Sequence, residues 1–406
     1  MANTLKFGNG EWYGKKDTIL AYNDENSNYK PLPFDFSRAS KATVINKDGL
    51  IEEVGSGEPR IDYKNNTKGA LLLEPSRSNA LPYSNKFLNT GWQYYRGTIT
   101  ANATISPDGT LNASRYQEDS QTGSHLFRRQ SLSITNGLSY TGSIFAKKGE
   151  LTSLRLASNS NSRWVAGAEF NLENGTVTSG TGVIENYGNG WYRCSISGNA
   201  VQTTTVAGFE IYTSVGVGRD GDGLFMYGAM FEQGSYATSY IPTSGSVVTR
   251  LADECNNAGN EQVINSTEGV LYAEMSALTS FQVSTIMISL SNGGSSAIRF
   301  GYQQGTSVFF VESTGAANNI GIYSEPINSL IYSKIALSYK ENDVKLYING
   351  FLVATDSVFT PFTSNVLNKL SFDNGVGVSD FYGNVKDVRV YNTALTDQEL
   401  IALTTI

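Results

Sequence analysis

An all-β fold is predicted by the strand pattern, the composition and the scarcity of helix signals. Short runs of alternating apolar and polar residues, such as 139–145 and 334–339, are separated by clusters of Gly, Asn and Ser, as in strands joined by turns. Charged residues make up only 17% of the 406 positions and glycine occurs 41 times, which argues against helical bundles, coiled coils and charge-driven disorder. Regularly spaced short strands indicate β-sandwiches or barrels.

The clearest local element is a β-hairpin at residues 343–355. Asn349 and Gly350 at its tip suit the positive φ angles of a type I′ turn. One face of the hairpin is expected to pack into a core, and it carries Val344, Leu346, Ile348, Phe351 and Val353.

One helix is predicted, at the C-terminal end of the sequence. Thr396 and Glu399 form the sequence signature of a capping box in front of Leu400 and Ile401. The helix should be one or two turns long.

Composition shifts near residues 74–79 and 240–250 predict three consecutive parts, at 1–80, 81–250 and 251–406. The first part contains a short extended aromatic run at 31–36, which is too short to bury a core of its own. We therefore expect it to pack on the middle part, 81–250, or to intertwine with copies of itself.

The charge balance limits the class of partner. A formal net charge of -7 and a pI near 5.0 leave no electrostatic basis for binding nucleic acid or an anionic membrane. A neutral, polar or carbohydrate partner suits this composition better.

Cysteine and histidine are too few for most metal and hydrolase sites. Cys194 and Cys255 lie far apart without nearby ligands, so we expect two reduced, buried thiols. Because His125 is the single histidine, neither a histidine-dependent catalytic triad nor a histidine metal cluster is expected. Residues 1–10 do not resemble a signal peptide, and no apolar run of 18 residues occurs, so neither export nor membrane anchoring is expected.

A glycan site needs aromatic rings beside amide or carboxylate groups. The sequence offers one candidate platform with neighbouring amides: Trp164, Asn186, Tyr187, Asn189, Trp191 and Tyr192. Trp191 follows a Gly-Asn-Gly turn and opens a strand, so a role as a core anchor is the alternative.

Two acidic pairs are candidate metal ligands. Asp220 and Asp222 lie in a Gly-rich turn that resembles the start of a calcium loop, but no Glu follows at the far ligand position. Asp373 and Asp380 lie in a second candidate loop, also without a calcium motif. No cofactor is expected, Ca²⁺ remains an alternative, and solvated turn residues are the simpler interpretation.

Glycoside cleavage would need two carboxylates about 5–10 Å apart in a cleft. Glu169, Glu173, Glu185 and Glu210 are available, but no motif singles out a pair. We therefore expect a protein that is not an enzyme.

The last third of the chain resembles the laminin-G/concanavalin-like jelly-roll family. The resemblance is carried by residues 268–275, 335–339, 346–350 and 381–395. It implies a β-sandwich at 251–406 of a kind that often binds glycans or proteins.

The rest of the chain resembles fibre proteins of tailed phages. Residues 140–147, 188–194 and 231–243 are similar to their carbohydrate-binding-module-like sandwiches. Three N-terminal stretches, 5–12, 29–40 and 49–54, are similar to N-terminal regions of head or tail fibre proteins, notably of crAss-like phages.

Together these resemblances imply tandem jelly-roll β-sandwich domains after an extended N-terminal attachment region. The implied protein is a homotrimeric head or tail fibre on the outer surface of a virion, bound to capsid or tail proteins and adhering to host-surface or mucus glycans. A purely structural virion protein and a glycan-degrading fibre are the alternatives. Attachment and oligomerisation are assigned to Trp12, Tyr13, Phe34, Phe36 and Arg38.

Overall fold

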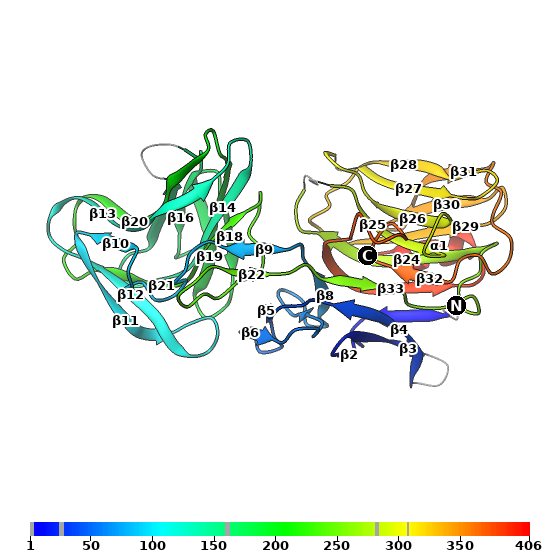
Figure 1. The fold of residues 1–406 in the computed structure, drawn as a ribbon, viewed down its shortest axis with the longest axis horizontal. Helices are drawn as coiled ribbons and strands as arrows, with labels where there is room; N and C mark the ends of the chain where they lie inside the picture. The colour runs from blue at the N-terminus through cyan, green and yellow to red at the C-terminus, as the bar shows by residue number, and fades with distance from the viewer. Residues whose placement is uncertain (1–3, 24–27, 159–162, 281–283, 307) are drawn as a thin grey trace. The chain divides into compact units, whose positions relative to one another are not determined.

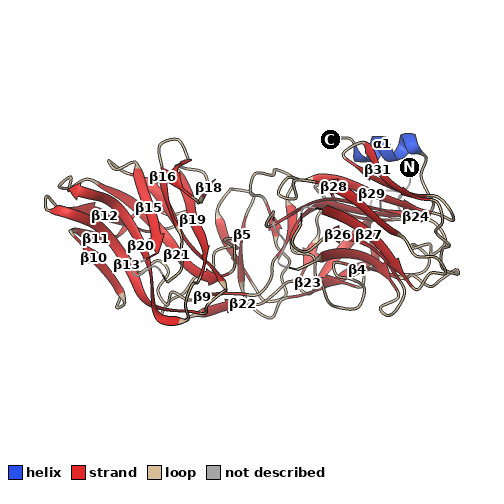
Figure 2. Ribbon diagram, turned by 90° about the horizontal axis from the view of Figure 1, so that it is seen from above, coloured by secondary structure: helices blue, strands red, loops and turns tan. Residues whose placement is uncertain are grey.

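The computed structural model describes residues 4–23, 28–158, 163–280, 284–306 and 308–406, and its regular secondary structure is almost entirely β-strand (Figures 1 and 2). The chain forms two compact units. Unit 1 comprises Met1–Lys41, Val54–Pro75 and Ala252–Ile406, and unit 2 comprises Ala42–Glu53 and Ser76–Leu251. The division differs from the three consecutive parts expected above, because the N-terminal region belongs mainly to the same unit as the C-terminal third.

Unit 1 is a β-sandwich whose larger sheet has the main-path order β23-β4-β3-β1-β33-β24-β29-β30-β31. These strands are β23 (Glu254–Asn256), β4 (Asn28–Ser37), β3 (Thr18–Asn23), β1 (Leu5–Gly8), β33 (Gly383–Tyr391), β24 (Gly269–Ala277), β29 (Ser333–Tyr339), β30 (Val344–Ile348) and β31 (Phe351–Asp356). Three short strands branch from this path: β2 (Gly14–Lys15), β7 (Ile61–Asp62) and β8 (Ala70–Leu73).

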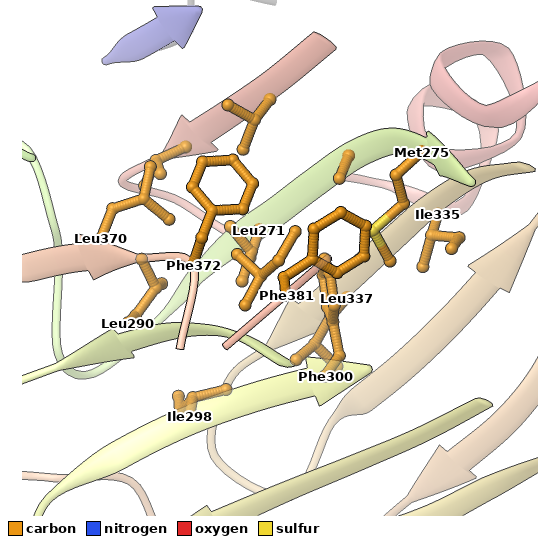
Figure 3. Packing of buried hydrophobic residues seen from close by; sticks show 14 of the residues in the cluster. Leu271, Met275, Leu290, Ile298, Phe300, Ile335, Leu337, Leu370, Phe372 and Phe381 are labelled. Atoms are coloured by element: carbon orange, nitrogen blue, oxygen red, sulfur yellow. The ribbon is translucent and has the colours of Figure 1, made fainter. Parts of the chain in front are cut away.

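The smaller sheet of unit 1 has the order β28-β27-β26-β25-β32. Its strands are β28 (Gly321–Pro326), β27 (Val308–Thr314), β26 (Ala297–Tyr302), β25 (Ile286–Ser291) and β32 (Lys369–Ser371). Side chains from both sheets meet in one apolar core, where Leu271, Ile335 and Leu337 of the larger sheet share a cluster with Ile298 and Phe300 of the smaller one (Figure 3).

The N-terminal region finds its burial inside unit 1. β1 pairs with β3 on one side and β33 on the other, and Leu5 lies opposite Val390. Phe7 and Phe34 contact each other with ring centroids 4.4 Å apart inside the common core. The apolar residues of this region are therefore satisfied without a second copy of the chain.

The predicted hairpin and helix are confirmed. β30 and β31 pair antiparallel, and Asn349 and Gly350 have φ angles of 53° and 88°. Phe351, however, is 73% exposed, because β31 is the last strand of the sheet and its side chains lack neighbours on one side.

α1 (Asp397–Thr404) starts with the capping box of Thr396 and Glu399. Its residues Leu400 and Leu403 pack on Tyr272 and Tyr347. No helix of the described residues is long and apolar enough to cross a membrane.

Unit 2 is a second β-sandwich of two six-stranded sheets. The β10–β17 sheet has the order β10 (Trp92–Tyr95), β13 (Thr122–Ile134), β20 (Thr204–Val217), β15 (Ser153–Ser158), β16 (Gly167–Asn171) and β17 (Thr176–Gly180). The β11–β18 sheet has the order β11 (Gly97–Ile105), β12 (Leu111–Glu118), β21 (Gly223–Gln233), β14 (Ser139–Lys148), β19 (Trp191–Asn199) and β18 (Val183–Asn186).

Two short pairs complete unit 2: β9 (Arg77–Asn79) with β22 (Val248–Arg250), and β5 (Ala42–Ile45) with β6 (Ile51–Val54). Ile45 and Ile51 of the second pair join a small apolar cluster with Phe145 and Trp191 of the β11–β18 sheet. This sheet therefore has a covering on the face that points away from the main core.

Both cysteines are buried and unpaired, as expected from their isolation in the sequence. Burial raises the pKa of both thiols. They are therefore apolar core residues at neutral pH.

A buried ionic network lies where the chain leaves and re-enters unit 1. Arg38 donates to Asp253 at 2.9 Å and to the carbonyl of Gly55 at 2.7 Å. Arg60 donates to Glu74 and to the second oxygen of Asp253. These residues flank the two excursions of the chain into unit 2, at 42–53 and 76–251, so the network joins all four crossing points.

Candidate functional site

The aromatic platform predicted from the sequence is part of the core. Trp164 is fully buried and donates its Nε1–H to the carbonyl of Gly208 at 3.0 Å, while Trp191 is 2% exposed and donates to the carbonyl of Ile105 at 3.1 Å. The alternative interpretation of Trp191 as a core anchor is the one that the structure supports, and it extends to Trp164.

The other members of that platform serve local structure. Tyr187 packs edge-on against Phe145 with centroids 4.8 Å apart, and Tyr192 packs against the main core of unit 2. Asn186 accepts a hydrogen bond from the Gly188 amide at 2.8 Å, and Asn189 has a φ of 51°. Both amides therefore shape the turn before β19.

An aromatic and charged surface lies instead on the outer side of the β10–β17 sheet. Cross-strand pairing aligns Tyr95, Leu126, Tyr212, Arg155 and Glu169 in one row over five neighbouring strands. The alternate residues of the same strands face the core. The polar members of this surface, here called the Tyr/Arg face, are Gln93, Tyr95, Arg128, Arg155, Glu169, Glu210 and Tyr212.

Hydrogen bonds hold one half of the Tyr/Arg face in place. Arg128 donates to Gln93 at 3.1 Å, to Glu210 at 3.2 Å and to the Tyr95 hydroxyl at 2.7 Å. Its guanidinium carbon also lies 4.7 Å from the Tyr95 ring centroid. The Tyr95 ring is thus ordered before any ligand arrives, which lowers the entropy lost on binding.

Glu210 is the buried centre of this network. It is only 3% exposed, and its second oxygen accepts a hydrogen bond from the Tyr212 hydroxyl at 2.6 Å. Burial, followed by the hydrogen bond to Glu210 and its negative charge, raises the pKa of Tyr212 to about 12. Tyr212 therefore stays a neutral hydrogen-bonding group at all physiological pH values.

The outer sides of three sheets differ in what covers them: the larger sheet of unit 1, the β11–β18 sheet and the β10–β17 sheet. Helix α1 packs on the outer side of the larger sheet in unit 1, and β5 and β6 pack on the β11–β18 sheet. Within the described part of unit 2, the Tyr/Arg face keeps exposed Gln93, Arg155 and Glu169 and a Tyr95 that is 37% exposed. Exposed rings with ordered polar neighbours are the groups that contact sugars.

The four predicted metal ligands do not gather. Asp220 and Asp222 lie in a turn closed by a 2.8 Å bond from the Asp222 amide to the Arg219 carbonyl. Asp373 accepts from the Gly375 amide, and Asp380 accepts from Tyr382. Among the described residues, no three His, Cys, Asp or Glu side chains are close enough to hold a metal ion.

His125 has a serine and an aspartate at its two ring nitrogens, an arrangement that counting histidines alone did not predict. Its Nδ1 lies 3.2 Å from the Ser214 hydroxyl and its Nε2 lies 3.5 Å from Asp119. The ring is fully buried, and a Cβ placed on Gly218 would lie 2.3 Å from Nε2. The loop backbone therefore covers the imidazole edge that a substrate would have to approach.

Most residues assigned to attachment point into unit 1. Phe34, Phe36 and Arg38 are at most 2% exposed. Trp12 packs partly against the core, whereas Tyr13 is 40% exposed. Of these five, Tyr13 is the exposed one, and Lys15 Nζ lies 5.2 Å from its ring centroid.

The fold defines an all-β protein of two sandwiches, and a lectin-like stretch lies in the first of them, unit 1. Residues 273–401 match the model of the concanavalin A-like lectin/glucanases superfamily. This match agrees with the laminin-G/concanavalin-like resemblance of the last third of the sequence. No curated protein matches the chain.

Several solved structures show partial likeness. The carbohydrate-binding module CBM40 of the Ruminococcus gnavus IT-sialidase is 20% identical with a TM-score of 0.31, covering 35% of this chain and 84% of that one. Domain 4 of the extracellular arabinanase AbnA from Geobacillus stearothermophilus, in complex with arabinotriose, is 15% identical with a TM-score of 0.32, covering 42% and 83%. Domains LG4-5 of the mouse laminin α1 chain are 11% identical with a TM-score of 0.25, covering 70% and 93%.

The sequence contains only a weak signal for the Tyr/Arg face. Trp92 and Gln93 precede two consecutive tyrosines, and such an aromatic run at a strand is a signal that sequence reasoning did not use. The partners Arg128 and Glu210 are 82 positions apart, so only the register of β13 and β20 brings them together.

Proposed function

We propose that the protein is a non-catalytic glycan-binding protein and that the Tyr/Arg face of unit 2 contacts the sugar. The observation that carries this proposal is the row of ordered, solvent-facing tyrosine, arginine, carboxylate and amide groups on one sheet surface. The Tyr95 and Tyr212 rings would stack on the apolar faces of sugar rings. Gln93, Arg155 and Glu169 would bond hydroxyl groups.

The context of the site supports this role. The lectin-like match at residues 273–401 lies in the other unit, so the chain would combine two sandwiches of sugar-binding type.

The test is glycan binding by the full chain on a multivalent array, followed by calorimetry with the best sugar. Tyr95→Ala should weaken binding about tenfold, or roughly 1.4 kcal/mol, while Tyr323→Ala, an exposed tyrosine of unit 1, should have no effect. Thermal melting of each variant confirms that it is folded. Absence of binding to every glycan, or equal affinities for both variants, would refute the proposed site.

Glycan cleavage is the second candidate, because two of the four acids named from the sequence lie on the Tyr/Arg face. Glu169 in β16 and Glu210 in β20 have β15 between them and are offset by two residues along the strands, so their backbones are about 12 Å apart. Inverting glycosidases place their carboxyl groups about 6.5–9.5 Å apart. Release of reducing ends that is lost in Glu169→Gln and Glu210→Gln would favour cleavage over adhesion.

We further propose, from the resemblance of the sequence to tailed-phage fibre proteins, that this binding serves adhesion by a virion fibre. Presentation of three faces on one homotrimer would raise avidity by increasing the effective concentration of sites. The burial of Phe7 and Phe34 within unit 1 removes one argument for a trimer, so the mass of the full chain in solution is the direct measurement. A monomeric mass would leave glycan binding intact and would favour a virion protein that assembles only on its capsid or tail partner.

A further inference from the structure

The two arginines of the Tyr/Arg face differ in how their donors are used. Each of the three guanidinium nitrogens of Arg128 donates a hydrogen bond, to Gln93, Glu210 and Tyr95. Arg155 is exposed, and its guanidinium carbon lies 5.4 Å from the Tyr212 ring centroid. Within the described chain, its side chain forms no hydrogen bond or ion pair with any other residue.

The direction in which Arg155 is held is informative. Glu169 lies directly opposite Arg155 on the neighbouring strand, a position from which oppositely charged side chains ordinarily pair. The guanidinium instead stacks over Tyr212, on the strand at the other side. Stacking on an aromatic ring orders the planar group and leaves its N–H edge available for a planar anion.

Beside Arg155 the sheet carries only small side chains. Ala157 and Gly167 are the next paired residues on the same side of β15 and β16. A Cβ placed on Gly167 would meet only the Leu156 carbonyl oxygen, at the ordinary contact distance of 3.6 Å. A ring that lies over these two residues would have Arg155 and Glu169 beside it, Glu210 directly across from Ala157, and Tyr212 on the diagonal.

From this arrangement we propose that the Tyr/Arg face is selective for acidic glycans and that Arg155 binds the carboxylate of a uronic or sialic acid residue. The guanidinium fork matches a carboxylate with two parallel hydrogen bonds. The sugar ring lies over Ala157 and Gly167 next to Tyr212, and Glu169 accepts from a hydroxyl group. Because the chain as a whole carries a formal charge of -7, this selectivity depends on the local cation and weakens as salt screens it.

This inference rests on the proposed glycan-binding function, and the experiment separates the two. Calorimetry of the full chain would use polygalacturonate and polysialic acid as the two acidic probes, each with its carboxyl-reduced, uncharged counterpart as control. We expect at least tenfold tighter binding of one acidic polymer than of its neutral counterpart. The two acidic probes distinguish a uronic acid from a sialic acid as the source of the carboxylate.

Two variants and one control locate the effect. Arg155→Met should remove at least tenfold of the preference for the acidic polymer, whereas Arg219→Met, at an exposed arginine of the same unit, should retain it. Gly167→Leu, which places a side chain over the open surface, should weaken binding of both polymers. Melting curves identify any variant that has lost its fold. If Arg155→Met or Gly167→Leu is unfolded, the other of these two variants tests the inference.

Each outcome has a distinct meaning. Equal affinity for the acidic and neutral polymers overturns the inference and leaves glycan binding standing. An acidic preference that survives in Arg155→Met also overturns it, because the carboxylate would then bind elsewhere. Absence of binding to all four polymers overturns the inference for these two acids, and only the glycan array then decides whether the proposed function also fails.

Discussion

Arg38 donates a hydrogen bond to Asp253 at 2.9 Å although 215 positions separate them in the sequence, and neither side chain is exposed. Asp253 also accepts from Arg60 and from the backbone amide of Glu74. Burial alone would lower the pKa of Arg60, but the charges of Asp253 and Glu74 raise it above its ordinary value. The network therefore sets two buried arginines, Arg38 and Arg60, against two buried carboxyl groups, Asp253 and Glu74.

Removing one partner of this network should destabilise unit 1 severely. Asp253→Asn leaves two buried guanidinium groups with too little negative charge, and loss of one partner of a buried ion pair is expected to cost about 3–5 kcal/mol. Urea unfolding measures the change. Lys340→Met, at an exposed lysine of the same unit, is the control, and equal stability of the two variants would contradict the role of the network.

A methyl group at Gly218 should disturb the loop over His125. The added Cβ would lie 1.9 Å from the Asp119 carbonyl oxygen and 2.3 Å from the His125 ring. We expect Gly218→Ala to lose about 1–3 kcal/mol of unfolding free energy through overpacking. Gly167→Ala is the matched control because its Cβ has space and the change lowers the entropy of the unfolded chain, so a similar loss there would contradict steric conflict as the cause.

Replacing Trp164 should affect stability but not the affinity for sugar. Its indole is fully buried and packs against Phe231 with centroids 5.2 Å apart. Trp164→Ala is expected to destabilise unit 2 by about 3–5 kcal/mol. Chemical unfolding gives the loss, and calorimetry at a temperature where the variant is still folded gives the affinity. A marked drop in affinity of the folded variant would restore the platform first predicted from the sequence.

Alkaline pH should weaken the fold. Burial raises the pKa of several tyrosines, including Tyr116, Tyr227 and Tyr240, above the ordinary value of 10.0, and that of Tyr212 to about 12. Above pH 10 the unfolded chain releases these protons while the native state keeps them, so the unfolding free energy falls as the pH rises. Urea unfolding at pH 8, 10 and 11 tests the slope, and a flat profile would contradict the burial of these phenols.

Replacing the Asp380 carboxyl group with an uncharged amide should stabilise the fold at neutral pH. Burial raises its pKa, as do the charges of Asp373 and Glu254, while the bond from Tyr382 lowers it. A carboxyl group with a raised native pKa is most compatible with the fold below its ordinary pKa and loses that advantage as the pH rises. Asp380→Asn should therefore raise the melting temperature at pH 7, and the gain should vanish in acid.

Melting in the presence of Ca²⁺ tests whether Asp380 is a metal ligand. Since no metal-binding group of three ligands forms among the described residues, added Ca²⁺ should leave the melting temperature unchanged. A rise with Ca²⁺ that Asp380→Asn abolishes would instead make Asp380 a metal ligand.

Local signals predicted local structure correctly. The capping box of Thr396 and Glu399 involves residues three positions apart, and the turn at Asn349 and Gly350 depends on the φ angles of two adjacent residues. Longer-range features were not predictable in this way. β1 pairs with β33 at the opposite end of the chain, and no local preference encodes which strand becomes its neighbour.

The candidate site illustrates the same limit. Trp191 has an aromatic ring of the kind that can stack on a sugar, but it opens a strand and its ring is buried in an apolar cluster. Its packing neighbours, and not the type of its side chain, therefore make it a core residue. Tyr95, Arg128 and Glu210 become one site only because three strands pair in a particular register.

The sequence by itself determined the all-β class, the hairpin, the helix and the concanavalin-like character of the last third, because each depends on nearby residues or on a continuous stretch. Only the tertiary structure decided that the N-terminal strands complete unit 1 and that Tyr95 and Tyr212 lie in one row on the outer side of the β10–β17 sheet. The physical reason is that sheet pairing and burial join residues hundreds of positions apart. Those contacts, and not the type of a side chain, determine whether it becomes a core anchor or part of a binding surface.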